Sequence, residues 1–502
     1  MRKLAKSDVY SIGVTLIIAA APVFLGAQAQ KQHPPRYRLV DLGTFGGPRS
    51  YASADGPGGR ILNNAGVVSS YADTTQPDPY APDFCYDADC LVAHAFRWER
   101  GVVEDLGSLA SGASSLVAHI NDHGWGIGQS ETGETDPLFG APQAEAVVWT
   151  GRRMIPLGYL PGGTESAGVS INNAGQAVSF GFNGVADPIA MIPVGFQNRT
   201  MFWDRGHAID IGTLGGPDAL PGGGCDLQRP GTIVGFSYTS YTPNANTGVP
   251  TQDPFLWDNG IMIDLGNLGG TISVAQCANN QEDVIGSSNL PGDQVSHAFL
   301  WRNGRITDLG TLGGVNSEAV WINHAGVIAG TADLPSPTIH DAVRWKDGQI
   351  LDLGTVDGDA CSRAGAINSS GVIVGASTNC GTALHAFVWQ ERGPMLDLNK
   401  LIPPGSGLQL TSALNINDRG EIVARSVPPG VSPNDDEDLG HLVLLIPCDE
   451  DSPCENAINS AAVQAQRPVT PAASPQPGRV VSLLKVWQSY RSMLSRKSFS
   501  EK

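Results

Sequence analysis

The side chains best suited to hold a ligand are concentrated between Tyr71 and Cys90, in the stretch YADTTQPDPYAPDFCYDADC. This stretch combines aromatic residues with Asp residues and ends in two Cys residues. Aromatic faces beside carboxylates suit a sugar, and clustered carboxylates also suit Ca²⁺, the only cofactor we consider. We therefore select six candidate ligand-binding residues, with a solvated acidic loop as the alternative: Tyr80, Asp83, Phe84, Tyr86, Asp87 and Asp89.

No catalytic residue can be assigned from the sequence. The chain has no nucleophile elbow, zinc-protease helix, P-loop or dinucleotide glycine motif in a suitable context. Glu131, Glu134 and Asp136 follow the acidic stretch, and glycoside cleavage needs a pair of carboxylates. Nothing in their spacing selects that reaction, so a glycan-active hydrolase or lyase stays the alternative to a binding protein.

Two residue types recur at fixed places, which favours structural roles. A His opens a strand at His94, His297, His385 and His441. A turn motif, DLG, starts at Asp41, Asp105, Asp210, Asp264, Asp308 and Asp352, with the variants PLG at Pro156 and DLN at Asp397. Copies in equivalent units serve a need of every unit, so we expect each His to hydrogen-bond within the fold. The Asp side chain can accept backbone N–H groups of the turn that follows it.

The eight units aligned on this motif predict an all-β propeller. In the clearest unit, HAFLW and RITDL flank the hairpin signal Asn303-Gly304, and SEAVWIN and VIAGTA follow. We expect these four antiparallel strands to form one blade. The ring would have about eight four-stranded blades, or seven if the stretch LPGGGCDLQRPG is not a blade.

The two ends of the repeat region complement each other. The region opens with YRLVDLG, a second strand without its first, and closes with His441 to Pro447, a first strand without its second. We expect the C-terminal strand to pair with the N-terminal blade, because closure hides both sheet edges. An open solenoid of sheets is the alternative.

The motifs HAFLW, DLGTLGG and IN..G.V.G together resemble the HAF-repeat family of extracellular bacterial repeat proteins. They are clearest at His297 to Trp301, Asp308 to Gly314, and Ile322-Asn323 with Gly326. The resemblance covers residues 36–447 and implies export and a repeat fold, but no activity and no site residues. Two units depart from it, since EAVVW lacks the His and CDLQRPG replaces the Ile-Asn turn.

Function should lie where the copies differ. Long insertions occupy residues 70–93, 130–144, 181–199 and 236–252, always between the fourth strand of one unit and the first strand of the next. We expect later units to keep short links there. Equivalent connections project from one face of a ring, so half of one face should carry elaborated loops.

The chain start and the cysteines indicate export. Arg2, Lys3 and Lys6 precede an apolar run, and residues 1–29 are predicted to be a signal peptide cleaved after Ala29, with an uncleaved anchor as the alternative. An exported chain favours disulfides. We expect four of them: Cys85–Cys90, Cys361–Cys380, Cys448–Cys454 and Cys225–Cys277.

Composition changes after the repeats. Residues 448–479 contain two Cys residues and a Pro-rich linker. Residues 480–497 have helical apolar spacing and basic residues, which predicts either an amphipathic helix that contacts a membrane surface or a disordered tail.

The net charge of −18 argues against a nucleic-acid partner. We expect a monomeric binding or scaffold protein that is secreted, periplasmic or on the cell surface. Its ligand would be an extracellular polysaccharide or a protein, while a purely structural component of the envelope is a further alternative.

Overall fold

The computed structural model describes residues 35–448, except 53–58, 87–88, 226, 337, 392, 429 and 434–439, and also Cys454, 458–459 and 479–480. The chain divides into Met1–Pro34 and Pro35–Lys502, and the description below concerns the second unit. The predicted signal peptide and most of the predicted C-terminal helix lie outside the described residues. None of the helices in the described part of the chain has the length and apolarity needed to cross a bilayer.

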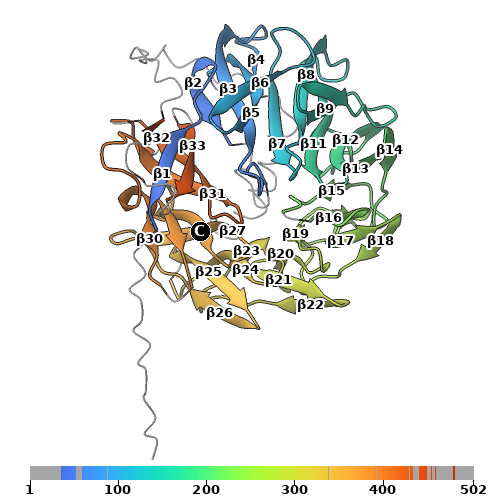
Figure 1. The fold of residues 1–502 in the computed structure, drawn as a ribbon. Helices are drawn as coiled ribbons and strands as arrows, with labels where there is room; N and C mark the ends of the chain where they lie inside the picture. Colours follow the sequence, from blue (N-terminus) through green and yellow to red (C-terminus); the bar gives the residue numbers. More distant parts are fainter. Residues whose placement is uncertain are drawn as a thin grey trace, which may run out of the picture. The chain divides into compact units, whose positions relative to one another are not determined.

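Eight antiparallel sheets are arranged around a ring, with the first strand of each sheet innermost and the last at the rim (Figure 1). The first four blades are as follows. Blade 1 contains β2 (Gly46–Tyr51), β3 (Val68–Pro77), β5 (Leu91–Glu99) and β6 (Val102–Gly107); blade 2 contains β7 (Ser115–Ile120), β8 (Gly126–Thr135), β9 (Pro142–Thr150) and β10 (Arg153–Pro156); blade 3 contains β11 (Ser166–Ile171), β12 (Ala177–Ala186), β13 (Phe196–Asp204) and β14 (His207–Asp210); blade 4 contains β15 (Ala219–Pro221), β16 (Thr232–Tyr238), β17 (Gln252–Asp258) and β18 (Ile261–Asp264).

The other four blades complete the ring. Blade 5 contains β19 (Ser273–Ala278), β20 (Val284–Asn289), β21 (Ser296–Arg302) and β22 (Arg305–Asp308); blade 6 contains β23 (Ser317–Ile322), β24 (Ile328–Asp333), β25 (His340–Lys346) and β26 (Gln349–Asp352); blade 7 contains β27 (Cys361–Ile367), β28 (Ile373–Thr378), β29 (Ala383–Trp389) and β30 (Leu396–Asp397); blade 8 contains β31 (Gln409–Ile416), β32 (Ile422–Val427), β33 (His441–Pro447) and β1 (Tyr37–Asp41). A short 3₁₀ helix, η1 (Leu398–Lys400), follows β30. The prediction of eight four-stranded blades is confirmed, and the Gly-rich stretch does form a blade.

The grouping of strands into blades differs from the sequence expectation by half a blade. The hairpin HAFLW–RITDL forms β21 and β22, which pair with the preceding β20 rather than with the following β23. Each strand is correct, but the sequence unit spans two sheets. The long turn DLGTLGG is the reason, because it carries the chain from the rim of one blade to the centre of the next.

The predicted ring closure is confirmed. β33 pairs antiparallel with β1, from Tyr37 opposite Pro447 to Asp41 opposite Val443, so the N-terminal strand completes the last blade. Two backbone hydrogen bonds extend this joint, from Leu42 N to the Leu442 carbonyl and from Cys448 N to the Arg36 carbonyl. β34 (Ile458–Asn459) adds to the outer side of β1 in parallel.

The repeated Asn of the IN motif joins neighbouring blades. In blade 6, the Asn323 Oδ1 accepts the N–H groups of Ala325 and Val327, which fixes the turn after β23. Its Nδ2 donates to the carbonyl of Asn368, the same residue of blade 7, at 3.0 Å. Equivalent bonds run from Asn63 to Asn121, Asn121 to Asn172, Asn279 to Asn323, Asn368 to Asn417 and, across the closure, Asn417 to Asn63. We call this set the Asn ladder.

The Asn ladder is interrupted at blade 4, where CDLQRPG replaces the motif. There Cys225 forms a disulfide with Cys277 of blade 5, and both residues are fully buried at the centre of the ring. His119 of blade 2 lies 3.2 Å from the Cys225 carbonyl through Nε2. Burial, followed by the nearby Arg60 guanidinium, lowers the pKa of His119 to about 3, so this imidazole is neutral. The replacement therefore fills the centre of the ring with contacts across several blades.

The structural roles predicted for the repeated His and Asp residues are confirmed. The Nδ1 atoms of His94 and His297 lie 2.9 Å from the carboxylates of Asp105 and Asp308, which close the same hairpins. Asp308 also accepts the Gly310 N–H at 2.8 Å, as expected for the DLG turn. His385 differs, because it pairs with Asp359 of a neighbouring turn at 2.8 Å.

All four predicted disulfides are present: Cys85–Cys90, Cys225–Cys277, Cys361–Cys380 and Cys448–Cys454. Disulfides in this number are typical of a chain that folds in an oxidising compartment.

Candidate functional site

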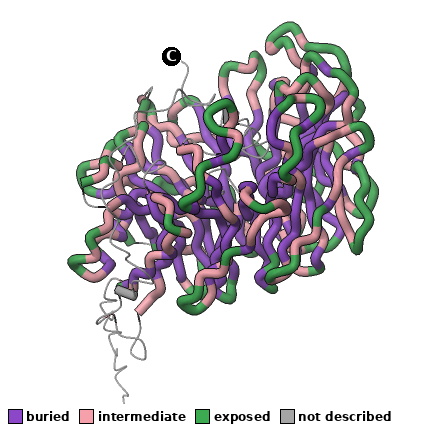
Figure 2. Tube along the Cα trace, turned by 90° about the horizontal axis from the view of Figure 1, so that it is seen from above, coloured by how far each residue is buried: buried purple, intermediate pink, exposed green. Residues whose placement is uncertain are grey.

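The long insertions lie on one face of the ring. They connect the second and third strands of blades 1 to 4, so they share one end of those strands, while the Asn turns occupy the other end. β3, β8 and β12 each contain 10 residues, whereas β20, β24 and β28 contain 6, so part of the extra chain prolongs the sheets. We call blades 1 to 4 the elaborated blades, blades 5 to 7 the plain blades, and this side of the ring the loop face. Figure 2 shows the ring from the side, with buried strands in the middle and exposed loops at the ends.

One part of the sequence expectation needs correction. Blades 5 to 7 keep short links in this position, for example residues 290–295, but blade 8 uses residues 428–440 between β32 and β33. This insertion was not recognised from the sequence, because the blade 8 copies of the repeat motifs, in TSALNIN and ARSV, are weak. Since blade 8 adjoins blade 1, the long connections occupy consecutive positions around the ring.

Arg49 organises the first insertion. Its side chain is 4% exposed and forms ion pairs with Asp73 at 3.3 Å and with Asp89 at 2.6 Å. The guanidinium also lies 5.0 Å from the ring centre of Tyr51, which stacks on Tyr71 at 4.7 Å. Burial lowers the pKa of Arg49, but its interactions with Tyr51 and the two carboxylates outweigh burial and raise it. The base of this loop is therefore fixed by a buried cation.

Asp78 shapes the tip of the same insertion. Its carboxylate accepts the backbone N–H groups of Tyr80 at 2.9 Å and Tyr86 at 3.1 Å. The Asp78 N–H donates to the carbonyl of Cys90, next to the Cys85–Cys90 disulfide. These hydrogen bonds and the disulfide therefore constrain the conformation of the loop.

The six candidate ligand-binding residues fall into two environments. Asp83 is exposed, and Tyr80 and Phe84 are half-buried. Tyr86 is 3% exposed and packs edge-on against Tyr71, with ring centres 6.4 Å apart. Asp89 is engaged by Arg49, as described above, and Asp87 lies outside the described residues. The structure brings Tyr80, Asp83 and Phe84 to the accessible side and directs Tyr86 and Asp89 into the loop.

The tail reaches the first insertion. β35 (Arg479–Val480) pairs in parallel with β4 (Phe84–Cys85). The segment after the Pro-rich linker is therefore seated beside the candidate residues, a contact that the sequence did not indicate.

Aromatic packing joins the second and third insertions. Phe139 meets Phe182 edge-on at 5.1 Å and Phe196 at 5.9 Å, while Phe182 and Phe196 stack at 5.8 Å. These rings border a buried cluster that also includes Tyr71 and Tyr86 of the first insertion. The insertions therefore share one apolar core and present a preformed surface.

A buried acidic cluster lies under the second insertion. Glu165, just before β11, is 4% exposed, and its Oε1 has no hydrogen-bond partner among the described residues. Burial, followed by the charges of Asp136 and Glu131, raises the pKa of Glu165 to about 9. Asp136 is fully buried and accepts the Leu138 N–H at 2.7 Å. Glu165 is therefore protonated at neutral pH, and sequence reasoning missed it because it lies outside the insertions.

Asp218 occupies the position of Glu165 one blade later. It accepts the backbone N–H groups of Met191 at 2.6 Å and Asn198 at 2.9 Å, so it anchors the third insertion. Burial raises the pKa of Asp218 to about 7, against the effect of these bonds and with a further increase from Asp187. Both carboxyl groups are under the loops and away from solvent.

The tips of three insertions expose apolar side chains. Leu138 is 45% exposed, Val185 is 51% exposed and Tyr241 is 63% exposed. Leu138 and Tyr241 lie in loops and Val185 lies near the end of β12, so one exposed apolar group stands on each of three adjacent insertions. The sequence predicted the insertions on this face, but it did not distinguish these exposed residues from buried ones.

The described residues contain no group of three or more His, Cys, Asp or Glu side chains arranged to hold a metal ion. Asp87, one of the carboxylates considered for Ca²⁺, lies outside the described residues, so calcium binding by the first insertion stays a prediction.

No family model and no curated protein matches this chain. Among solved structures, it is similar to an acylaminoacyl peptidase from Pyrococcus horikoshii, with TM-score 0.38 and 12% identity over 79% of this chain and 58% of that chain. It is also similar to the β-propeller domain of the Trilobed protease from Pyrococcus furiosus, with TM-score 0.40 and 10% identity over 74% of this chain and 100% of that domain. TolB from Acinetobacter baumannii aligns with TM-score 0.26 and 11% identity over 50% of this chain and 60% of that chain. Similarities of this size carry no argument about activity.

Proposed function

We propose that this protein is an exported propeller of the HAF-repeat family that binds an extracellular macromolecule through the loop face of the elaborated blades. The observation that carries the proposal is the set of insertions on consecutive blades, fixed by buried contacts and exposing one apolar side chain on each of three tips. Equivalent loops on a rigid scaffold are a common way to build a recognition surface.

A protein partner fits this surface better than a polysaccharide. Separate apolar tips beside acidic groups match a protein with basic and apolar patches, and the net charge of −18 supports attraction of a basic surface. A polysaccharide is the second candidate, because Tyr80 and Phe84 flank the exposed Asp83 on the first insertion.

A glycan-active hydrolase is less well supported. The raised pKa of Glu165 would suit a general acid, but Glu165 is 4% exposed and Asp136 is fully buried. A polymeric substrate cannot touch these groups in this conformation, so we propose binding without turnover.

Two variants with three substitutions each, all from an exposed large apolar residue to Ser, test the proposal. The tip variant carries Leu138→Ser, Val185→Ser and Tyr241→Ser. The rim variant carries Ile209→Ser, Ile261→Ser and Leu351→Ser, which are 48%, 68% and 40% exposed on the outer strands. Each variant and the wild type are assayed for capture of extracellular proteins and for binding to a glycan array. Hydrolysis is assayed on every glycan that binds.

We expect the tip variant to lose binding at least tenfold and the rim variant to retain it, because about 1.4 kcal/mol of buried apolar contact gives this factor. Equal binding by the tip variant and the wild type would refute a role for the loop face. Turnover of a bound glycan would replace the binding proposal with the hydrolase.

A further inference from the structure

The turn between the first two strands of each blade pairs a constant position with a variable one. The Asn of the ladder is constant in every blade except blade 4, and its role is structural. The residue after it changes from blade to blade but is always polar: Asn64, Asp122, Asn173, Gln228, Asn280, His324, Ser369 and Asp418. These eight residues encircle one mouth of the ring, on the side opposite the loop face. We call them the mouth residues.

Hydrogen bonds connect most neighbouring mouth residues. The backbone N–H of one donates to the side-chain oxygen of the next, for example from Asp122 to Asn173 at 2.8 Å and from Gln228 to Asn280 at 2.7 Å. The same bond runs from Asn64 to Asp122, Asn173 to Gln228, Ser369 to Asp418 and Asp418 to Asn64. Among the described residues, none joins Asn280 to His324 or His324 to Ser369. The circle of bonds is open at His324.

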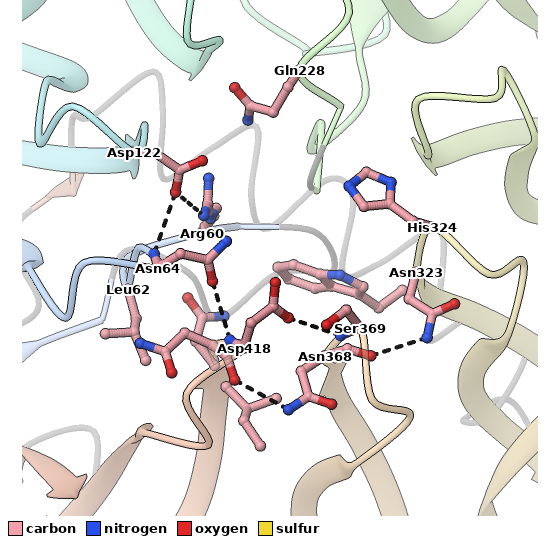
Figure 3. Close-up of a pocket in the computed structure, with 14 residues that line it drawn as sticks. Arg60, Leu62, Asn64, Asp122, Gln228, Asn323, His324, Asn368, Ser369 and Asp418 are labelled. Atoms are coloured by element: carbon pink, nitrogen blue, oxygen red, sulfur yellow. Dashed lines mark hydrogen bonds and ion pairs between the residues drawn. The ribbon is translucent and has the colours of Figure 1, made fainter.

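A pocket lies beside this opening. It has a volume of about 50 Å³, and Leu62, Trp321 and Ile416 contribute apolar surface to its wall. This volume holds roughly four water molecules, and the pocket continues into open solvent. In Figure 3 the side chains of Asp122, Gln228, His324 and Ser369 stand around an open centre.

Several polar groups of the pocket are not used by the fold. The Gln228 Nε2 is buried and has no hydrogen-bond partner among the described residues. The side chains of His324 and Ser369 likewise make no hydrogen bond within the described part of the chain. A buried donor without a partner is costly, so a ligand that accepts its hydrogen bond would be favoured.

The side chains that line the pocket argue against an anion and against a metal ion. Arg60 is buried and pairs with Asp122 at 2.6 Å, so its charge is offset. Asp418 adds a second carboxylate, which leaves no excess positive charge for an anion. No metal-binding group of side chains is found in the described residues, as stated above. A neutral ligand with several hydroxyl groups fits best, because each hydroxyl both donates and accepts a hydrogen bond.

We propose that this pocket, formed by the mouth residues His324, Ser369 and Gln228 and walled by Trp321, binds a small neutral polyol such as a single sugar or a sugar alcohol. The site is independent of the loop face, because it lies at the opposite ends of the strands. The imidazole and the two side-chain donors contact hydroxyl groups, Asp418 accepts from one of them, and the indole covers the apolar face of the ligand.

Calorimetric titration of the purified protein tests the proposal. The probes are free hexoses, N-acetylhexosamines, glycerol and sorbitol, together with oligosaccharides that end in the same sugars. We expect at least one to bind in the micromolar to millimolar range, and His324→Ala and Ser369→Ala each to weaken it about tenfold. His207→Ala and Ser370→Ala, which change exposed residues outside the pocket, are the matched controls.

The outcomes separate clearly, provided that all variants keep the wild-type melting temperature. Binding of free compounds alone identifies a soluble polyol, and equal binding of oligosaccharides identifies the end of a glycan chain; both support the proposal. Absence of binding up to about 10 mM overturns it. Binding that both pocket variants retain, or binding of phosphate or Ca²⁺ that they abolish, also overturns it. If either pocket variant has a lowered melting temperature, Gln228→Glu is measured in its place. This variant keeps a side-chain oxygen that accepts the Asn173 N–H and removes the Nε2 donor. Full retention of binding by Gln228→Glu then counts against the proposal.

Discussion

The elaborated and plain blades have the same four strands but differ at one aligned position near the start of the innermost strand, the residue that precedes Ser50, Ser115, Ser166, Ala219, Ser273, Ser317 or Ser362. In the plain blades this residue is neutral: Ile272, Asn316 or Cys361. In three of the elaborated blades it is charged or a carboxyl group: Arg49, Glu165 or Asp218. Asn316 accepts the Ser296 N–H at 3.1 Å and so joins two blades. Arg49 and Asp218 instead hold an insertion.

This difference shows how one scaffold position serves two purposes. A neutral residue is sufficient where the link above it is short. A long loop needs a fixed base, and a buried ion pair or carboxyl group supplies it at the cost of desolvation. The elaborated blades therefore carry buried groups that a plain blade does not require, and removing these groups should affect the two halves differently.

The largest effect is expected from Arg49→Gln in blade 1. It removes the cation from the Asp73 and Asp89 pairs, of which Asp73 is fully buried. Breaking a buried pair by removing one partner costs about 3 kcal/mol. The unfolding free energy from urea titration should fall by this amount. Arg100→Gln in the same blade, where the side chain is 91% exposed, should leave it unchanged, and equal values for both variants would contradict the role of Arg49.

A pH-dependent effect of similar size is expected from Glu165→Gln. Because the folded pKa of Glu165 is about 9 and its ordinary value is 4.5, folding favours the protonated form. The contribution of Glu165 to the unfolding free energy is therefore fully present below pH 4.5 and is lost as the pH rises toward 9. At pH 7 the wild type has lost roughly 3 kcal/mol of this contribution. Glu165→Gln should melt higher than the wild type at pH 7 and equally at pH 4.5.

The exposed Glu134 of the same insertion provides the control. Melting curves of Glu134→Gln should follow the wild type at both pH values. A Glu165→Gln profile that runs parallel to the wild type between pH 4.5 and 8 would show that this carboxyl is ionised in the folded protein.

A smaller effect is expected where the Asn ladder differs between the halves. Asn323→Ala removes two turn bonds and the bond to blade 7, whereas Asn172→Ala removes two turn bonds and a bond to Gln176 within its own blade. At about 1 kcal/mol per bond the two variants should lose similar stability, so the effect that distinguishes them is about 1 kcal/mol, from the single bond between blades that only Asn323→Ala removes. Faster hydrogen exchange in β27 after Asn323→Ala, without a matching change in β15 after Asn172→Ala, would establish the difference.

Much of the fold follows from local sequence signals. The hairpin signal Asn303-Gly304, the DLG turn and the pairing of the last strand with the first are all encoded by short motifs or by a missing strand. The half-blade shift was not predictable, because a repeat unit has no inherent starting point. Only the sheet pairing shows that β21 belongs with β20.

Less of the candidate site follows from the sequence. The insertions and the Cys85–Cys90 loop were predicted, since they stand out against the repeat. Tyr86 and Asp89 look the same in sequence as Tyr80 and Asp83, yet the first pair faces Tyr71 and Arg49. The environment of Glu165 depends on contacts with the neighbouring blade, which no spacing rule reveals. The mouth residues could not be predicted either. Each follows a constant Asn in the sequence, but only the fold shows that the eight turns lie next to one another.

The central claim is that the elaborated blades bind an extracellular partner by the tips of their insertions. Hydrogen exchange of the protein, free and with the ligand that the capture or array assay identifies, measures this directly. Protection should appear in residues 130–144, 181–199 and 236–252 and be absent from residues 290–295 and 334–339. Protection of the short links of the plain blades, or of the outer strands alone, would contradict the account.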